Sequence, residues 1–340
     1  MAEEHQGGYK LLSRYRGELM GLAMLGVMLF HAYELELTSL PLRAFRQMGF
    51  AGVDIFLLLS GMGICCSMYR REGEPVGQYY LRRCRRLLPA FWLVVGLYSV
   101  ALALAGRIRP DVILWNLSTL SYWWNIPGGF NWYVSAIVVL YLFAPLYYRL
   151  FRRCRQKELL TLALYLVCYV LYRQTWGAGM LHLMDFILRV PDFAMGFLLA
   201  SYLEEGKKLN GRHLVCWVGA AVCSVAVLYM WCIQPVIAPL CQVVTLGLVP
   251  ACLVLSKLLD WLPGRWFHRF LRTVGGSSLE VYLLNVIITR EFDLLAPWLD
   301  HDPIHITYYL IAYPINLVLG ILLHRGLERL KKEQTNDKLY

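Results

Sequence analysis

The sequence predicts an all-α fold, a polytopic integral membrane protein with about ten transmembrane helices and both termini cytoplasmic. Of its 340 residues, 58% are hydrophobic and only 16% are charged, whereas a soluble domain exposes far more polar surface. Apolar runs of about 18–22 residues recur along the chain, and each is long enough to cross a hydrocarbon core about 30 Å thick. The period-2 alternation of a membrane barrel is missing from the sequence, so helices are the expected way to satisfy the backbone in lipid.

The apolar runs place the spans along the chain and divide it into three parts. A cytoplasmic segment, 1–17, precedes a transmembrane domain, 18–325, and a cytoplasmic tail, 326–340, follows it. The segment 111–125 is too short and too aromatic for a span and suits an interfacial helix. The predicted spans lie near residues 18–36, 49–68, 89–106, 130–149, 158–175, 186–203, 213–232, 236–256, 274–291 and 305–324.

Lysine and arginine are distributed unevenly between alternate loops. With the N-terminus inside, the cytoplasmic segments hold 26 of the 33 basic residues and the outer segments hold 6. This asymmetry follows the positive-inside rule and predicts that both termini are cytoplasmic. It also accounts for the net charge of +10 without nucleic acid as a partner. The ten cysteines show neither a CxxC pair nor a metal-ligand spacing, so no disulfide and no metal site is expected.

Ionisable side chains inside predicted spans are costly, and they are therefore candidate functional groups. His31 lies at the outer end of the first span, and Asp54 enters the second span at a similar depth. Because consecutive spans usually pack together, a carboxylate beside the imidazole would fix its tautomer and raise its basicity. The alternatives are an interfacial histidine and an aspartate that only caps its helix.

A basic stretch, 78–92, precedes the third predicted span. It contains Arg82, Arg83, Arg85 and Arg86. These arginines suit anchoring on anionic lipid or binding of a phosphate-rich cytosolic ligand, because guanidinium forks match phosphate geometry.

Two later stretches also carry polar groups near the membrane. Arg189 and Asp192 have the i,i+3 spacing of an ion pair at a span entrance. Glu280 and Asn285 lie in the ninth predicted span, where Glu280 also suits the first turn of a helix. Each of these residues is a further candidate for the functional site.

Taken in order, these features resemble the membrane acyltransferase 3 family, which includes the O-antigen and other cell-surface polysaccharide acetylases. The family shows a histidine in the first span, a GV-D/x-x-F-F-x-x-S-G second span, and an R-R-x-x-R-x-x-P segment. Later it shows W-Y, R-x-P and G-x-x-S-x-x-x-Y-L-x-H segments. The resemblance covers about residues 14–325. The matching positions are His31, Gly52, Val53, Asp54, Ser60, Gly61, Arg82, Arg83, Arg86, Pro89, Trp132, Tyr133, Tyr141, Pro145, Arg189, Pro191, Gly196, Gly275, Ser278, Tyr282 and Leu283.

Three departures from the family pattern stand out. The family's basic residue in the first span falls at Met20, and Arg16 lies one helical turn earlier. The family's closing histidine is replaced by Asn285. The glutamate that follows the tryptophan in many polysaccharide acetylases is absent, because Ile137 and Val138 stand there.

The resemblance implies an O-acyltransferase that moves an acyl group, most often acetyl, from cytosolic acyl-CoA to a hydroxyl of an envelope glycan or lipid-linked sugar. Acyl-CoA is then a co-substrate, and no bound cofactor is expected. The protein is expected to be a multi-pass protein of the bacterial plasma membrane, in contact with its lipids. His31 is the expected general base and Asp54 the residue that orients its ring. The residues expected to bind acyl-CoA or the acceptor are Arg16, Arg82, Arg83, Arg86, Trp132, Tyr133, Arg189, Glu280, Tyr282 and Asn285.

Two other classes of function fit the same residues. A permease or flippase for a polar small molecule or lipid-linked sugar would also use intramembrane charges. A membrane-anchoring or partner-binding module would need no chemistry, and a homo-oligomer is compatible with all three classes. Transfer of label from acetyl-CoA to the protein or to a glycan separates the enzyme from the other two.

Overall fold

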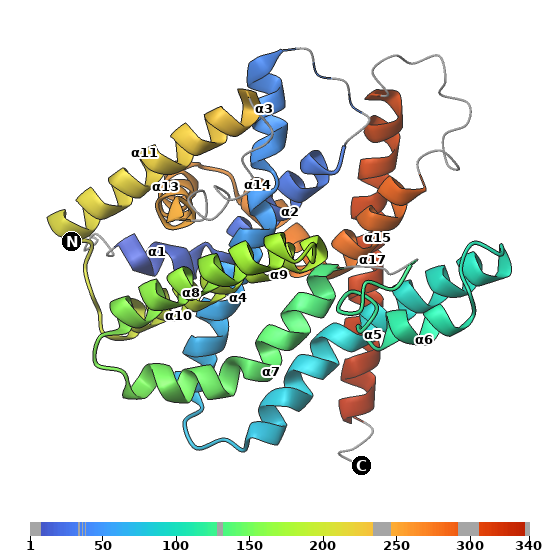
Figure 1. The fold of residues 1–340 in the computed structure, drawn as a ribbon, viewed down its shortest axis with the longest axis horizontal. Helices are drawn as coiled ribbons and strands as arrows, with labels where there is room; N and C mark the ends of the chain where they lie inside the picture. Colours follow the sequence, from blue (N-terminus) through green and yellow to red (C-terminus); the bar gives the residue numbers. More distant parts are fainter. Residues whose placement is uncertain are drawn as a thin grey trace.

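The computed structural model describes residues 8–32, 35, 37, 39–127, 132–233, 246–291 and 306–336. Within these ranges the regular structure is entirely helical, without a strand, which confirms the predicted all-α class (Figure 1). The helices are α1 (Gly8–Arg14), α2 (Arg16–Phe30), α3 (Leu40–Met48), α4 (Ala51–Arg70), α5 (Val76–Leu104), α6 (Asp111–Leu117), α7 (Trp132–Arg153), α8 (Lys157–Gly177), η1 (Leu181–Leu183), α9 (Met184–Ile187), α10 (Val190–Glu204), α11 (Gly211–Ile233), α13 (Leu248–Trp261), α14 (Arg265–Gly276), α15 (Ser278–Arg290) and α17 (Ile306–Asn336).

Four segments of the described chain are long and apolar enough to cross a membrane. They are the continuous stretch Leu40–Arg70, which contains α3 and α4, and the helices α5, α7 and α17. Several other predicted spans coincide with shorter helices, such as the 15-residue α2 and α10 and the 13-residue α15. At about 1.5 Å per residue, these helices are shorter than a hydrocarbon core about 30 Å thick. The first part of the predicted span 236–256 lies outside the described residues.

Two helices run further than the sequence pattern indicates. The basic stretch 78–92 and the third predicted span form one continuous helix, α5, which passes through Pro89. The arginines of its first half are therefore rigidly connected to the apolar second half. The last helix, α17, continues to Asn336, so most of the predicted tail extends this helix.

The centre of the molecule is built where helix backbones approach closely at glycines. A Cβ atom on Gly61 of α4 would lie only 2.1 Å from the carbonyl oxygen of Phe193 in α10, and Gly196 of α10 approaches α4 in the same way. On the other side of the core, a Cβ atom on Gly275 of α14 would lie 2.1 Å from the carbonyl oxygen of Gly17 in α2. Small residues at such crossings let helices pack tightly, which is a main source of association in lipid.

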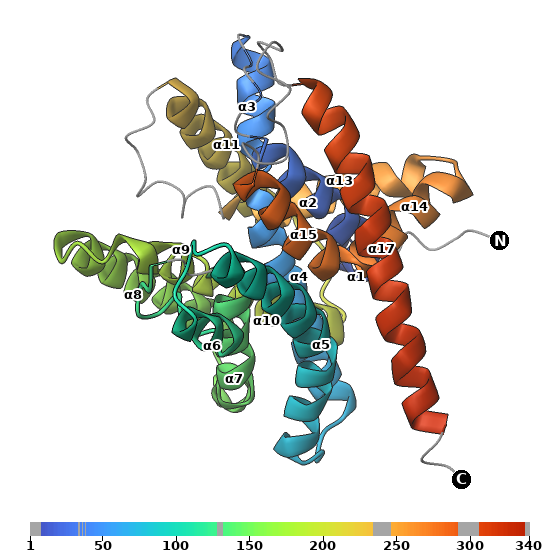
Figure 2. The same ribbon diagram turned by 90° about the vertical axis from the view of Figure 1, so that its right-hand side faces the viewer.

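The remaining helices surround this centre. The helix α15 contacts both α5 and α17, and α17 runs along one edge of the molecule (Figure 2). The helix α14 packs against α2 and lies at the periphery (Figure 2). This arrangement leaves α2, α4, α5, α7 and α15 around a common space, which contains the candidate site.

Candidate active site

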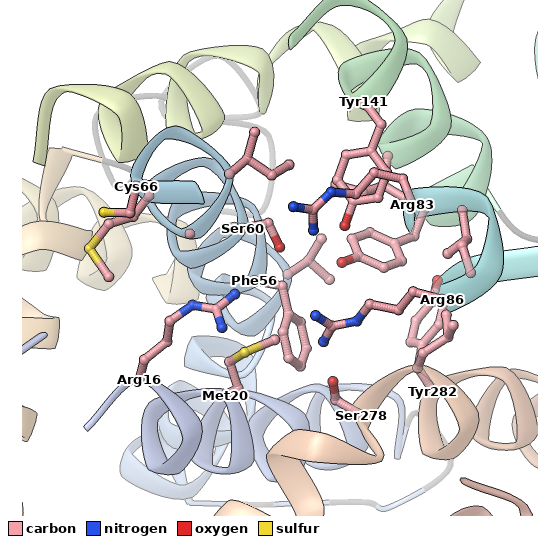
Figure 3. Close-up of a pocket in the computed structure, with 18 of the residues that line it drawn as sticks. Arg16, Met20, Phe56, Ser60, Cys66, Arg83, Arg86, Tyr141, Ser278 and Tyr282 are labelled. Carbon is pink, nitrogen blue, oxygen red and sulfur yellow. The ribbon is translucent and has the colours of Figure 1, made fainter. Parts of the chain in front are cut away.

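A cavity of about 230 Å³ opens between α2, α4, α5, α7 and α15. Arg70, at the end of α4, lines it, and three further arginines point into it (Figure 3). Arg16 comes from the first turn of α2, and Arg83 and Arg86 come from α5. No aspartate or glutamate is among the described side chains that line the cavity. The three positive charges therefore face each other without a carboxylate between them, which favours an anionic ligand.

Arg16 is held in place by the backbone of α4. Its Nε donates a hydrogen bond of 3.1 Å to the carbonyl oxygen of Leu59. The absence of a side chain on Gly63 makes room for the guanidinium group, because a Cβ atom there would lie 3.0 Å from its Nη2. One edge of the guanidinium is thus used for positioning, and the other nitrogens are left to face the cavity.

Arg83 is packed between aromatic rings. Its guanidinium lies 5.4 Å from the ring centre of Tyr79 and 5.7 Å from that of Tyr141. Its Nε is buried and has no hydrogen-bond partner among the described residues. Such cation–π contacts orient an arginine without using up its donors. The buried donor is therefore available to a ligand, which would remove the cost of leaving it unsatisfied.

The aromatic and hydroxyl side chains of the cavity follow helical spacing. Tyr133, Ile137 and Tyr141 line it at i, i+4 and i+8 of α7, and Ser278 and Tyr282 line it at i and i+4 of α15. The rings of the two residues predicted to bind substrate, Tyr133 and Tyr282, meet edge-to-face with their centres 5.2 Å apart. The helical spacing is the signal by which sequence reasoning could have added Tyr141 and Ser278 to the site.

Arg82 does not reach the cavity, although it was expected with Arg83 and Arg86. Its guanidinium donates two hydrogen bonds to the carboxylate of Glu74. This hydrogen bonding lowers the pKa of the Glu74 carboxyl below its usual value. Helical spacing does not separate Arg82 from the other two, because positions 82 and 86 are four residues apart, only about 40° around the helix. The ion pair occupies Arg82 outside the site.

His31 caps the other end of α2 and does not line the cavity. Along the helix axis it lies fifteen residues from Arg16, a distance of about 22 Å. Its Nδ1 is 2.8 Å from the carbonyl oxygen of Val27. Since a carbonyl only accepts, Nδ1 carries the proton in this contact, and Nε2 is the basic nitrogen of the neutral ring.

Asp54 is paired with an arginine, so its expected role as the partner of the His31 ring is not what the structure shows. Its carboxylate is buried and lies 2.8 Å from Nε of Arg189. Arg189 also contacts Asp185 at 3.0 Å and lies 4.8 Å from the ring centre of Trp132. The tautomer of His31 is instead fixed by its own helix. Arg189 was predicted to pair with Asp192, and the acids that it contacts at these distances are Asp54 of α4 and Asp185 of α9.

Glu280 and Asn285 lie on α15 but face α17. Glu280 accepts a hydrogen bond from Nδ1 of His324 at 3.1 Å, and Asn285 accepts one from Asn316 at 3.4 Å. The α15 residues that line the cavity are Ser278, Leu279 and Tyr282. Glu280 and Asn285 therefore join two helices, and the structure does not bring them to the cavity.

Comparison with known protein families matches residues 19–325 to the acyltransferase domain family. The chain belongs to this family. It is an O-acyltransferase, as the sequence motifs predicted. Its relatives in the family include the acyltransferase MdmB of Streptomyces mycarofaciens, which is 26% identical over 277 residues, covering 72% of this chain and 69% of the relative.

Two further relatives match shorter parts of the acyltransferase. The peptidoglycan O-acetyltransferase OatA of Listeria monocytogenes is 32% identical over 131 residues, which cover 36% of this chain and 20% of the relative. The exopolysaccharide production protein ExoZ of Rhizobium meliloti is 38% identical over 87 residues, which cover 26% of this chain and 25% of the relative. The matches to these two proteins thus span about a quarter or less of their length. Comparison with solved structures gives no match.

Proposed function

We propose that this acyltransferase moves an acyl group, in the expected case acetyl, from acyl-CoA to a hydroxyl of an envelope glycan or a lipid-linked sugar. The observation that carries the proposal is the convergence of Arg16, Arg83 and Arg86 on one cavity (Figure 3). Guanidinium forks bind phosphates through paired, charge-assisted hydrogen bonds. The relatives named for peptidoglycan and exopolysaccharide support a glycan as the acceptor.

In this proposal the arginine cavity holds the phosphates of the donor, and its pantetheine arm extends along α2 toward His31. The acceptor hydroxyl gives its proton to Nε2 of His31 while its oxygen attacks the thioester carbonyl. The new C–O bond forms, the C–S bond breaks, and the thiolate of CoA leaves and takes up a proton. The Val27 carbonyl supports this role, because it holds the imidazole in the tautomer whose Nε2 accepts.

The proposed topology has ten spans with both termini in the cytoplasm. The meeting of Arg16, Arg70 and Arg83 at one cavity supports it, because the start of α2, the end of α4 and the first half of α5 must then lie on one side. Reporter fusions after Ala105 and Asp185 should be active outside, and a fusion after Gln156 inside. An outside signal at Gln156 would contradict this topology.

The donor site is tested by exchanging one arginine for lysine. Arg83→Lys keeps the charge but loses the fork and the buried Nε donor. With labelled acetyl-CoA and purified protein in nanodiscs, the KM for acetyl-CoA should rise about 10-fold or more, the size expected for a lost hydrogen bond to a charged group. The matched control is Arg85→Lys, which is exposed and lies two residues away, about 200° around the helix. Equal KM values for both variants would show that Arg83 does not bind the donor.

A transport function is less well supported by the same structure. The charges expected to serve it, Asp54 and Arg189, are joined in a buried ion pair, which neutralises both groups. A transported polar molecule would have to compete with that pair. The arginine cavity, by contrast, has positive charges without a lining carboxylate among the described residues.

A further inference from the structure

A second basic groove lies on the far side of the junction between α1 and α2. Ser13 and Arg16 line the donor cavity, whereas Arg14 and Tyr15, between them in sequence, line the other groove. The groove encloses about 580 Å³. Its remaining wall is formed by the first three turns of α14, with Arg265, His268, Arg269, Arg272 and Thr273.

Two acids contact arginines of this groove and neutralise only part of its positive charge. Glu18, which is 1% exposed, accepts a hydrogen bond of 2.7 Å from Nε of Arg272. Asp260 lies 3.4 Å from Arg14. Arg265 and Arg269 are exposed, and neither side chain has an ion-pair or hydrogen-bond partner in the part of the chain that the structure describes. The groove therefore has an excess of two positive charges, held by arginines whose donors are open.

The helix that carries these arginines, α14, has the length and the amphipathic character of a helix that lies at a membrane surface. Its 12 residues reach about 18 Å, too short to cross the bilayer. One face is buried against α2 through Leu271 and Gly275. Another face exposes Trp266, which is 76% exposed and stacks on Phe270 with ring centres 5.8 Å apart. Tryptophan is enriched at the level of the lipid headgroups.

We propose that this groove binds the phosphate of an anionic phospholipid headgroup, and that α14 lies in the surface of the cytoplasmic leaflet. Arg265 and Arg269 contact the phosphate, and Trp266 and Phe270 lie among the glycerol backbones and the first acyl carbons. The phosphate source is a lipid because the aromatic pair lies beside the arginines on the same short helix. The nucleotide of acyl-CoA is the alternative phosphate ligand for this groove. The α1–α2 junction separates the groove from the arginine cavity proposed to bind acyl-CoA.

The test measures lipid binding directly and does not depend on acyl transfer. Native mass spectrometry of the purified full chain, titrated with phosphatidylglycerol or phosphatidylcholine, should show a preference for phosphatidylglycerol. Arg265→Gln/Arg269→Gln should weaken phosphatidylglycerol binding by about 10-fold or more, from the contribution of each arginine near an anionic surface. Arg265→Lys/Arg269→Lys should retain most of it. The matched control, Arg153→Gln/Arg155→Gln, removes two exposed arginines from the end of α7 and the loop after it and should change it less than twofold.

Two results would overturn the assignment. One is unchanged phosphatidylglycerol binding in the glutamine double variant at an unchanged thermal unfolding temperature. The other is weaker binding of free CoA by the same variant with lipid binding intact, which would give the groove to the nucleotide of the donor. Lipid binding is measured without acceptor or turnover. The binding result can therefore be interpreted even if the proposed acyl transfer is not observed.

Discussion

The buried ion pair between Asp54 and Arg189 makes an asymmetric prediction about stability. Arg189→Gln leaves Asp54, which is 1% exposed, without the guanidinium 2.8 Å away. Removing one partner of a buried pair costs about 3–5 kcal/mol, because the other charge is left uncompensated. Asp54→Asn is milder, because Arg189 keeps Asp185 at 3.0 Å and the ring of Trp132. We expect it to cost about 1.5–3 kcal/mol, the size of one hydrogen bond to a charged group.

The double variant separates the pair from the packing around it. If the two side chains interact directly, Asp54→Asn/Arg189→Gln should cost clearly less than the two single changes added together, since neither buried charge is then left alone. Unfolding in mixed micelles titrated with SDS gives the three free energies. The exposed pair Arg109 and Asp111, at 2.9 Å with side chains 82% and 49% exposed, provides the matched control. Its disruption should cost less than about 1 kcal/mol.

Two results would refute this reasoning. One is an Arg189→Gln variant no less stable than Asp54→Asn, which would mean that the buried carboxylate does not need the arginine. The other is strict additivity in the double variant, which would mean that the 2.8 Å contact contributes no coupling. In both cases the association of α4 with α10 would be stabilised by the close packing at the glycines and not by the ion pair.

Two other predictions concern the chemistry and the core. His31→Gln should insert and fold normally but lose acyl transfer by about 100-fold or more, the scale of a removed general base; a turnover number within a few-fold of the wild type would exclude this role. Gly196→Ala should lower the thermal unfolding temperature sharply, because the new Cβ would lie 2.2 Å from a backbone carbonyl oxygen of α4. The control Gly77→Ala, which meets nothing within 4 Å, should be neutral or slightly stabilising, and equal effects of the two changes would contradict the close crossing.

The sequence predicted several cavity residues that share a helix, although Arg82 of α5 was also expected there and does not line the cavity. The spacing of Arg83 and Arg86 places them on one face of α5, and both reach the cavity. Tyr133 and Tyr282 were also expected there, and they line it together. The all-α class and the long apolar helices follow from hydropathy, because a backbone in lipid has few other ways to satisfy its hydrogen bonds.

The choice of partners came only from the tertiary structure. Asp54 and His31 lie at similar predicted depths, but depth in the membrane does not specify which neighbouring helix a side chain faces. In the structure, the glycine crossing between α4 and α10 brings Arg189 to Asp54, and Glu280 turns to His324 on α17.

The sequence by itself therefore determined that this is a helical membrane acyltransferase, with a basic stretch before the third predicted span and a histidine at the end of the first span. The tertiary structure decided that Arg16, and not Arg82, completes the arginine cavity. The physical reason is that helical periodicity fixes the direction of a side chain from its own helix axis. The rotation and crossing of each helix against its neighbours are set by packing between residues far apart in sequence.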